Sequence, residues 1–193
     1  MTDEQLLGQA IGGDESAFQV LYQRHREPVY RFAYRLTTSV EAAEDIAHDC
    51  FLGLMQRPQL FDPKRGELRT YLYGSVRNLA NKHFRRSGRS IATDELDQTA
   101  APAAHGEPLR DLLAGERARA VQRAIAALPE LQREALILFE YEGLKLEEIA
   151  AVVDADLSAV KSRIHRARQN LKRTLAPLLA PGAESTYLEG ATR

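Results

Sequence analysis

Residues 144–173 read LKLEEIAAVVDADLSAVKSRIHRARQNLKR, and this stretch decides how the C-terminal part of the chain folds. Apolar residues recur every three or four positions on both sides of Asp154-Ala155-Asp156, which predicts two amphipathic helices joined by a tight turn. Asp154 is a residue type that tolerates the left-handed backbone of such a turn, and we expect Ser158 to cap the second helix. The pattern is that of a helix-turn-helix, whose second helix enters the major groove of DNA.

The second of these helices carries charge of one sign. Every charged residue from Leu157 to Arg173 is a lysine or an arginine. A solvated basic helix is the alternative, because cations near a helix C-terminus also interact favourably with its dipole. Such a helix usually pairs its cations with nearby glutamates, and this segment contains none, so DNA contact is favoured. The residues that face away from the apolar stripe are Ser162, His165, Arg166 and Gln169, and Lys161 and Arg168 flank them.

Composition predicts an all-α protein. The chain has 193 residues, of which 44% are hydrophobic, and is rich in Ala, Leu, Arg and Glu. Its net charge is −1, which does not argue against DNA binding because the location of the charge matters more than its total. Cys50 is the one cysteine, so no intramolecular disulfide can form. No apolar run approaches ~18 residues and the N-terminus lacks a signal-peptide pattern, so we expect a soluble, cytoplasmic protein.

Three helices are predicted before residue 57. Thr2, Asp14 and Ser39 are their expected N-caps, and Pro28 should kink or split the second helix. The third helix has a regular apolar face and an opposite acidic stripe, which either is simply solvated or binds a basic partner surface. His48 and Cys50 lie on different faces and lack further ligands, so we predict no metal site. The acidic stripe consists of Glu41, Glu44, Asp45, His48 and Asp49.

A loop at residues 57–66 precedes a helix expected at about 68–86. The basic residues of this helix can neutralise phosphates, its amides can read base edges, and its aromatic rings can stack on unpaired bases. This combination suggests a surface for single-stranded or opening DNA. The alternative is that the tyrosines pack in the core and the amides are merely solvated. The polar face of the 68–86 helix consists of Arg77, Asn78, Asn81, Lys82 and Arg85, with Tyr71, Tyr73 and Phe84 nearby. His83 is expected on the opposite, inner face.

The chain therefore divides into two small helical domains joined by a flexible acidic linker. The linker, residues 87–108, is rich in Ala, Pro and Gly and has no periodic apolar face. It separates an N-terminal domain of residues 1–86 from a C-terminal helix-turn-helix domain of residues 109–175. Residues 176–193 carry two prolines, and we expect a disordered tail there.

Two blocks of this sequence resemble the extracytoplasmic-function (ECF) sigma factors, the minimal two-domain members of the sigma-70 family of bacterial RNA polymerase. The first block is AEDIAHDCFLGLM followed by FDPKRGELRTYLYGSVRNLANKHFRR. The second is ALPELQREALILFEYEGLKLEEIAAVVDADLSAVKSRIHRARQNLKR. A helix-turn-helix alone is weakly specific, whereas both blocks in this order and at this separation are strongly specific.

The resemblance implies a dissociable initiation factor that binds core RNA polymerase and promoter DNA. The polar face of the 68–86 helix would melt and read the minus-ten element, with Asn78 capturing a flipped base. The residues that match the family's recognition helix would read the minus-thirty-five element as duplex; these recognition residues are Lys161, Ser162, His165 and Arg166. An anti-sigma partner is expected, but no catalytic residue, cofactor, metal or membrane insertion. The docking residues, which would bind the polymerase clamp, are Glu44, Asp45, His48 and Asp49.

Two alternatives remain open at this point. A stand-alone dimeric helix-turn-helix regulator would bind duplex DNA without polymerase, but it leaves the polar face of the 68–86 helix without a role. A small enzyme holding a metal on Glu44, Asp45 and Asp49 would need facing carboxylates from other helices. The sequence contains no phosphate-binding GxxxxGK[ST] loop that would indicate nucleotide hydrolysis.

Overall fold

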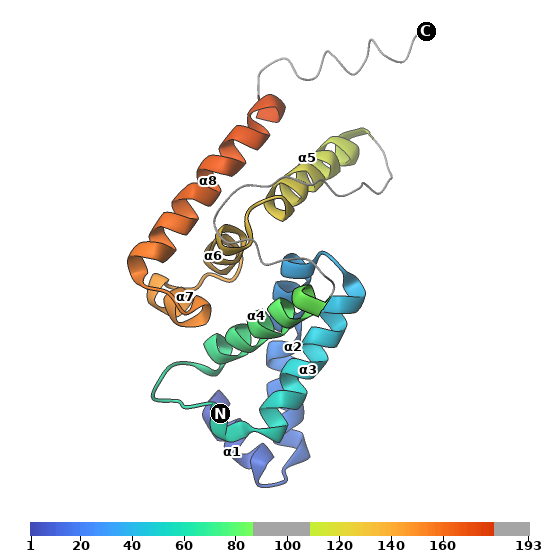
Figure 1. Cartoon of the computed structure of the whole chain (residues 1–193). Helices are drawn as coiled ribbons and strands as arrows, with labels where there is room; N and C mark the ends of the chain where they lie inside the picture. Colours follow the sequence, from blue (N-terminus) through green and yellow to red (C-terminus); the bar gives the residue numbers. More distant parts are fainter. Residues whose placement is uncertain (87–108, 180–193) are drawn as a thin grey trace.

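The computed structural model describes residues 1–86 and 109–179, and every regular element in these ranges is a helix. Figure 1 shows two lobes, which we call the N-lobe and the C-lobe. The N-lobe contains α1 (Asp3–Ile11), α2 (Glu15–Thr37), α3 (Val40–Gln56), the short 3-10 helix η1 (Pro58–Leu60) and α4 (Leu68–Arg86). The C-lobe contains α5 (Leu109–Ala126), α6 (Glu130–Glu140), α7 (Leu146–Val153) and α8 (Leu157–Leu179). The all-α prediction is confirmed, and the predicted linker at 87–108 lies outside the described residues.

Side-chain caps begin the first three helices, as the sequence predicts. Thr2 and Gln5 form a reciprocal capping box at α1, and the Asp14 carboxylate accepts hydrogen bonds from two first-turn amides of α2. The Ser39 hydroxyl accepts a hydrogen bond from the Ala42 amide at 3.2 Å. These bonds satisfy donors that a helix cannot satisfy within its own first turn.

The N-lobe core forms where α2, α3 and α4 meet. Leu21, Phe32 and Leu72 are fully buried there. Of the two outcomes predicted for Pro28, a kink or a split, the split does not occur, because α2 runs unbroken from residue 15 to 37. Proline removes one backbone hydrogen bond from a helix interior, and here the packing of α2 against α1, α3 and α4 holds the helix together.

The C-lobe contains the predicted helix-turn-helix. α7 ends at Asp154, which adopts the left-handed conformation with φ 50° and ψ 58°. The predicted N-cap of α8 is wrong: the Asp156 carboxylate accepts the hydrogen bond from the Ala159 amide at 2.7 Å, and Ser158 is already inside the first turn. α8 also continues through Pro177 to Leu179, past the predicted domain end at 175; residues 180–193 lie outside the described part.

α4 lies on the side of the N-lobe that faces the C-lobe. It packs on α2 and α3 on one side and against α7 on the other, and α2 also contacts α6 (Figure 1). The helix predicted to contact opening DNA therefore has two packed faces. Among the described helices, none is both long enough and apolar enough to span a bilayer.

Candidate functional site

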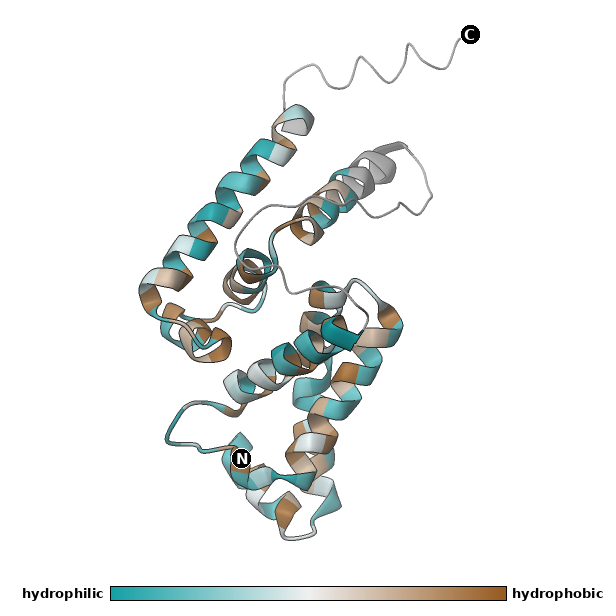
Figure 2. Cartoon of the chain, in the orientation of Figure 1, coloured by the Kyte–Doolittle hydropathy of each residue, from teal (hydrophilic) through white to brown (hydrophobic). Residues whose placement is uncertain are grey.

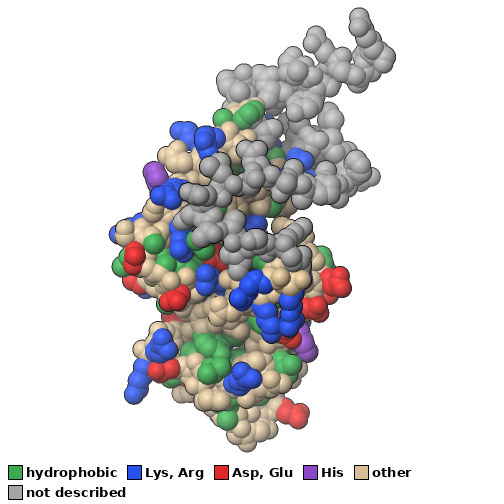
Figure 3. Space-filling model, viewed as in Figure 1, with side chains coloured by type: hydrophobic (Ala, Val, Ile, Leu, Met, Phe, Trp, Pro, Cys, Tyr) green, Lys and Arg blue, Asp and Glu red, His purple; other side chains and the backbone are tan. Residues whose placement is uncertain are grey.

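The polar face of α4 is only partly at the surface. Asn78, Lys82 and Arg85 are exposed, and Asn81 is half-buried. Arg85 Nε donates a hydrogen bond to the backbone oxygen of Asn81 at 3.3 Å, which orients its guanidinium along the helix. Basic side chains gather at the C-terminal end of α4 (Figure 3). This end of the helix therefore presents cations and amides together, as the sequence predicts.

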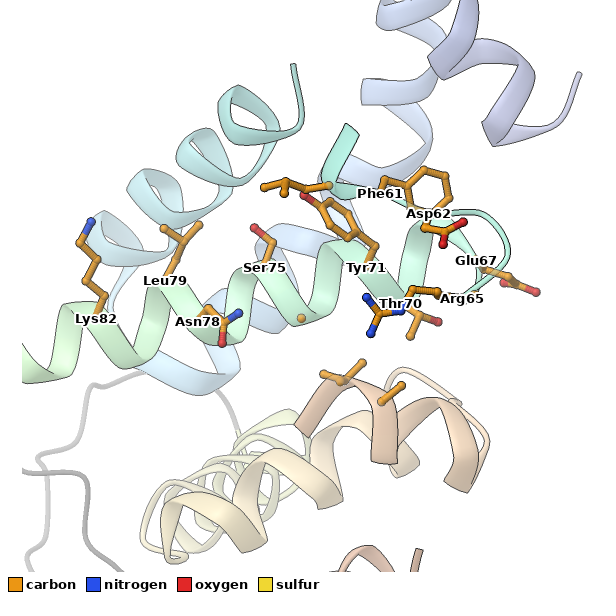
Figure 4. Close-up of a pocket in the computed structure, with 15 residues that line it drawn as sticks. Phe61, Asp62, Arg65, Glu67, Thr70, Tyr71, Ser75, Asn78, Leu79 and Lys82 are labelled. Carbon is orange, nitrogen blue, oxygen red and sulfur yellow. The ribbon is translucent and has the colours of Figure 1, made fainter. Parts of the chain in front are cut away.

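Tyr71 and Asn78 line a pocket of about 560 Å³ between α4, the preceding loop and α7. Figure 4 shows the ring of Tyr71 beside that of Phe61, with their centroids 5.6 Å apart in an edge-on arrangement. Burial raises the pKa of the Tyr71 hydroxyl. A hollow of this volume with aromatic and amide walls suits a flat ligand of nucleobase size. Sequence reasoning missed Phe61, which comes from a loop with no periodic signal.

Tyr73 and Arg77 do not occupy the open surface that the sequence predicts. Tyr73 is 2% exposed, and its ring meets that of Phe32 in the N-lobe core. Burial, with the hydrogen bond to Glu142, raises the pKa of its hydroxyl. Arg77 Nε donates to Glu134 Oε2 at 2.9 Å. Both side chains turn toward the C-lobe, a contact that helical periodicity within α4 cannot show.

The apolar face of α4 also differs from its prediction. Phe84 is buried, whereas His83, which the sequence places on the inner face, is exposed. Because α4 packs on two sides, its buried face is wider than a single stripe. Phe84 therefore belongs to the core.

The docking residues lie on the outer face of α3. Glu44, Asp45, His48 and Asp49 are all exposed, while Cys50 on the opposite face is buried. Burial raises the pKa of the Cys50 thiol to about 11, as expected for a small residue of the core. Among the side chains that the structure describes, no group of His, Cys, Asp and Glu is arranged to hold a metal ion.

A second hollow, of about 370 Å³, adjoins the docking residues. It lies between α2 and α3, and Tyr22, Arg26 and Tyr30 line it together with Glu44 and His48. Tyr22 on α2 is 39% exposed. Its ring packs edge-on against Phe51, 4.9 Å between centroids, so it covers the core from outside. The acidic surface thus has an aromatic border that the helical pattern does not reveal.

The recognition residues Lys161, Ser162, His165 and Arg166 are all exposed on α8. On the other side of the helix, Val160, Ile164 and Ala167 are buried in the C-lobe. Figure 2 shows that most residues along α8 are hydrophilic. The helix therefore presents a polar, cationic surface that a DNA groove could accept.

Arg168, further along α8, is held within the lobe. Its guanidinium bonds Glu140 at 2.5 Å and lies over the ring of Phe139, 5.2 Å from the centroid. This contact fixes α8 against α6.

Two family descriptions match the chain. Sigma-70 region 2 matches residues 21–90, which include α4, and sigma-70 region 4 matches residues 118–171, which include the helix-turn-helix. The chain is 32% identical over 187 residues to the RNA polymerase sigma-H factor of Pseudomonas aeruginosa, covering 92% of this chain and 95% of the relative. The chain belongs to the sigma-70 family of RNA polymerase sigma factors.

Further relatives place it within the ECF group. The ECF RNA polymerase sigma factor SigE of Mycolicibacterium smegmatis is 34% identical over 178 residues, covering 90% of this chain and 68% of the relative. The ECF RNA polymerase sigma-E factor of Escherichia coli K12 is 30% identical over 189 residues, covering 93% of this chain and 97% of the relative. Among solved structures, CnrH in complex with the cytosolic domain of CnrY matches with a TM-score of 0.66 and 27% identity, over 90% of this chain and 97% of that one.

These matches confirm the family that the sequence resembles. The chain is an RNA polymerase sigma factor, which directs polymerase to promoters and takes part in the start of transcription. They favour this function over a stand-alone dimeric regulator.

Proposed function

We propose that the chain binds core polymerase through the docking residues on α3, opens and reads the minus-ten element with α4, and reads the minus-thirty-five element with α8. The observation that carries this proposal is the pocket beside Asn78 on α4, together with the exposed cationic face of α8 in the C-lobe. In this proposal the chain binds and positions nucleic acid without catalysing a reaction. An inhibitory partner of the anti-sigma type would control access to these surfaces.

At the minus-ten element, we propose that an unpaired base enters the pocket lined by Tyr71 and Asn78. The exposed amide of Asn78 carries both a donor and an acceptor, so it can pair with a base edge. Phe61 and Tyr71 offer ring surfaces for stacking. Lys82 and Arg85, one and two turns further along α4, would hold the phosphate backbone beside the pocket.

At the minus-thirty-five element, we propose that Arg166 reads a base edge in the major groove while Lys161 contacts phosphate. An arginine can form two parallel hydrogen bonds to guanine, whereas a lysine acts as a point charge. Ser162 and His165 lie on the same exposed face and would complete the contact.

A promoter-opening assay with reconstituted holoenzyme tests this division of roles. Asn78→Ala should impair strand opening, followed by permanganate footprinting, more than it weakens duplex binding. Arg166→Ala should weaken binding to the upstream element by about 1–3 kcal/mol in a gel-shift titration. Gln122→Ala and Arg173→Ala serve as matched exposed controls on α5 and α8. The reverse pattern, with Arg166→Ala impairing only opening, would refute the proposal.

A pull-down with core polymerase tests the docking surface. Asp45→Lys reverses a charge at the centre of the docking residues and should reduce retention of core enzyme several-fold, because like charges at an interface repel. Glu147→Lys makes the same charge change on the exposed surface of the C-lobe and should have little effect. Equal loss in both variants would argue against a specific acidic docking site.

A further inference from the structure

One cation of α8 is held by residues of another helix. The guanidinium of Arg168 donates from Nε and Nη2 to Glu140 Oε1, at 2.9 and 2.5 Å, and Glu140 is the last residue of α6. The same guanidinium lies over the ring of Phe139, 5.2 Å from its centroid. Two consecutive residues of α6 therefore orient the guanidinium of Arg168.

This ion pair lies in solvent. The side chains of Arg168 and Glu140 are 54% and 42% exposed. Ion pairs this exposed contribute little to folding stability, because water and salt screen them. Arg77 provides a contrast, since its side chain is only 16% exposed and bonds the buried Glu134. Stability alone is therefore a weak reason for the pair, and its place on the cationic helix indicates a role in binding.

Arg168 belongs to a row of cations along one edge of α8. At about 100° per residue, Lys161, Arg168 and Lys172 lie within roughly 40° of one another around the helix axis. All three are exposed. Within the described part of the chain, Arg168 is the member of this row that has a carboxylate partner. It follows Lys161, the proposed phosphate contact, by two turns on the same edge.

Glu140 leaves part of the Arg168 guanidinium available. The pair uses the edge formed by Nε and Nη2, and Nη1 makes no hydrogen bond to any residue that the structure describes. A guanidinium binds phosphate through such N–H groups. Because the side chain is already oriented, less conformational entropy is lost when it binds a ligand.

We propose that Arg168 binds a promoter phosphate through Nη1, and that Glu140, with the ring of Phe139, positions it for this contact. The inference rests on the proposed role of α8 at the minus-thirty-five element. Phosphate contacts carry no sequence information, but they fix the register of a protein on the duplex. Arg168 thereby holds α8 in the register from which Arg166, two residues earlier, reads a base edge.

Duplex binding by the full chain, followed by fluorescence anisotropy over a range of salt concentrations, tests the phosphate contact. Two duplexes of unrelated mixed sequence serve as probes, because a phosphate contact does not depend on sequence. Arg168→Gln should weaken binding to both duplexes several-fold. It should also reduce the slope of log K against log salt by about 0.9, the value for one phosphate contact.

A matched control removes the same charge elsewhere on the helix. Arg173→Gln changes an exposed cation on another side of α8 and should alter the slope less than Arg168→Gln does. An unchanged slope in Arg168→Gln would overturn the phosphate contact. Melting curves followed by circular dichroism should coincide for the parent chain and Arg168→Gln, since the pair is exposed.

Glu140→Gln separates positioning from simple charge. Loss of a negative charge near DNA by itself tightens binding, and Glu147→Gln, at an exposed carboxylate of the same lobe, measures that effect. Positioning predicts the opposite sign. Glu140→Gln should weaken binding to both duplexes, because the released guanidinium must then be ordered by the DNA. Binding as tight as in the parent chain, or tighter, would overturn the positioning role.

A double-mutant cycle tests whether Glu140 acts through Arg168. In the Arg168→Gln background, Glu140→Gln should no longer weaken binding, because the side chain that it orients is absent. If Glu140→Gln weakened binding by the same factor in both backgrounds, Glu140 would act by another route and the positioning role would be refuted.

Failure of the proposed function would give a different result. Lys161→Gln removes the phosphate contact that the proposed function assigns to α8. If neither Lys161→Gln nor Arg168→Gln changed duplex binding, the role of α8 itself would fail. If Lys161→Gln weakened binding and Arg168→Gln did not, only the contact of Arg168 would be refuted.

Discussion

Replacement of Asp156 tests how the recognition helix begins. Asp156 Oδ1 accepts the hydrogen bond from the Ala159 amide at 2.7 Å, and this amide is a first-turn donor of α8. Removal of such an N-cap acceptor costs about 1 kcal/mol, within a range of roughly 0.5–2 kcal/mol. Asp156→Ala should therefore lower the free energy of unfolding by about that amount, which corresponds to a melting temperature roughly 2–4 °C lower for a chain of this size.

Two companion variants separate the hydrogen bond from other effects. Asp156→Asn keeps the acceptor and removes the charge, so it should remain close to the parent chain. Ser158→Ala changes the residue that sequence reasoning selects as the cap, and a surface change of this kind costs less than about 0.5 kcal/mol.

Urea unfolding followed by circular dichroism gives the stability of each variant. Hydrogen exchange at the Ala159 amide localises the effect, because that amide loses its acceptor only in Asp156→Ala. If Ser158→Ala cost as much as Asp156→Ala, the cap assignment would be wrong. If Asp156→Asn were as unstable as Asp156→Ala, charge rather than the hydrogen bond would be responsible.

Two other predictions concern the N-lobe. Burial raises the pKa of the Cys50 thiol from 9.0 to about 11, so the folded state keeps this proton at pH values where the unfolded state has lost it. The free energy of unfolding therefore has its full value below pH 9 and falls as the pH rises toward 11. Urea titrations should show the unfolding free energy falling by roughly 1–3 kcal/mol more in this window than in Cys50→Ala, and parallel pH profiles would contradict the raised pKa. Asp3 bonds His25 at 2.7 Å as well as Arg24, so Asp3→Asn should speed hydrogen exchange in α1 by several-fold, whereas the exposed Glu4→Gln should not. Equal exchange in both variants would show that this contact does not hold α1.

Local signals in the sequence predict the helices and the family. The α4 boundaries at 68 and 86 agree with the prediction, and the left-handed Asp154 was identified by its residue type and position. Caps, turns and periodic apolar faces depend on neighbours within a few residues, so one sequence suffices to find them. The docking and recognition residues are exposed as expected, because each lies opposite the apolar face of its own helix. Their roles in binding stay predictions.

Contacts between distant segments were decided only by the tertiary structure. Nothing near Tyr73 or Arg77 in the sequence indicates that Glu142 and Glu134, 69 and 57 residues further along, bind them. The sequence by itself therefore determined an all-helical sigma factor with two cationic helices, since those patterns are local. Only the packing of the C-lobe on α4 decided which of the predicted contact residues are free and which are held, because burial and ion pairing depend on which surfaces meet in space.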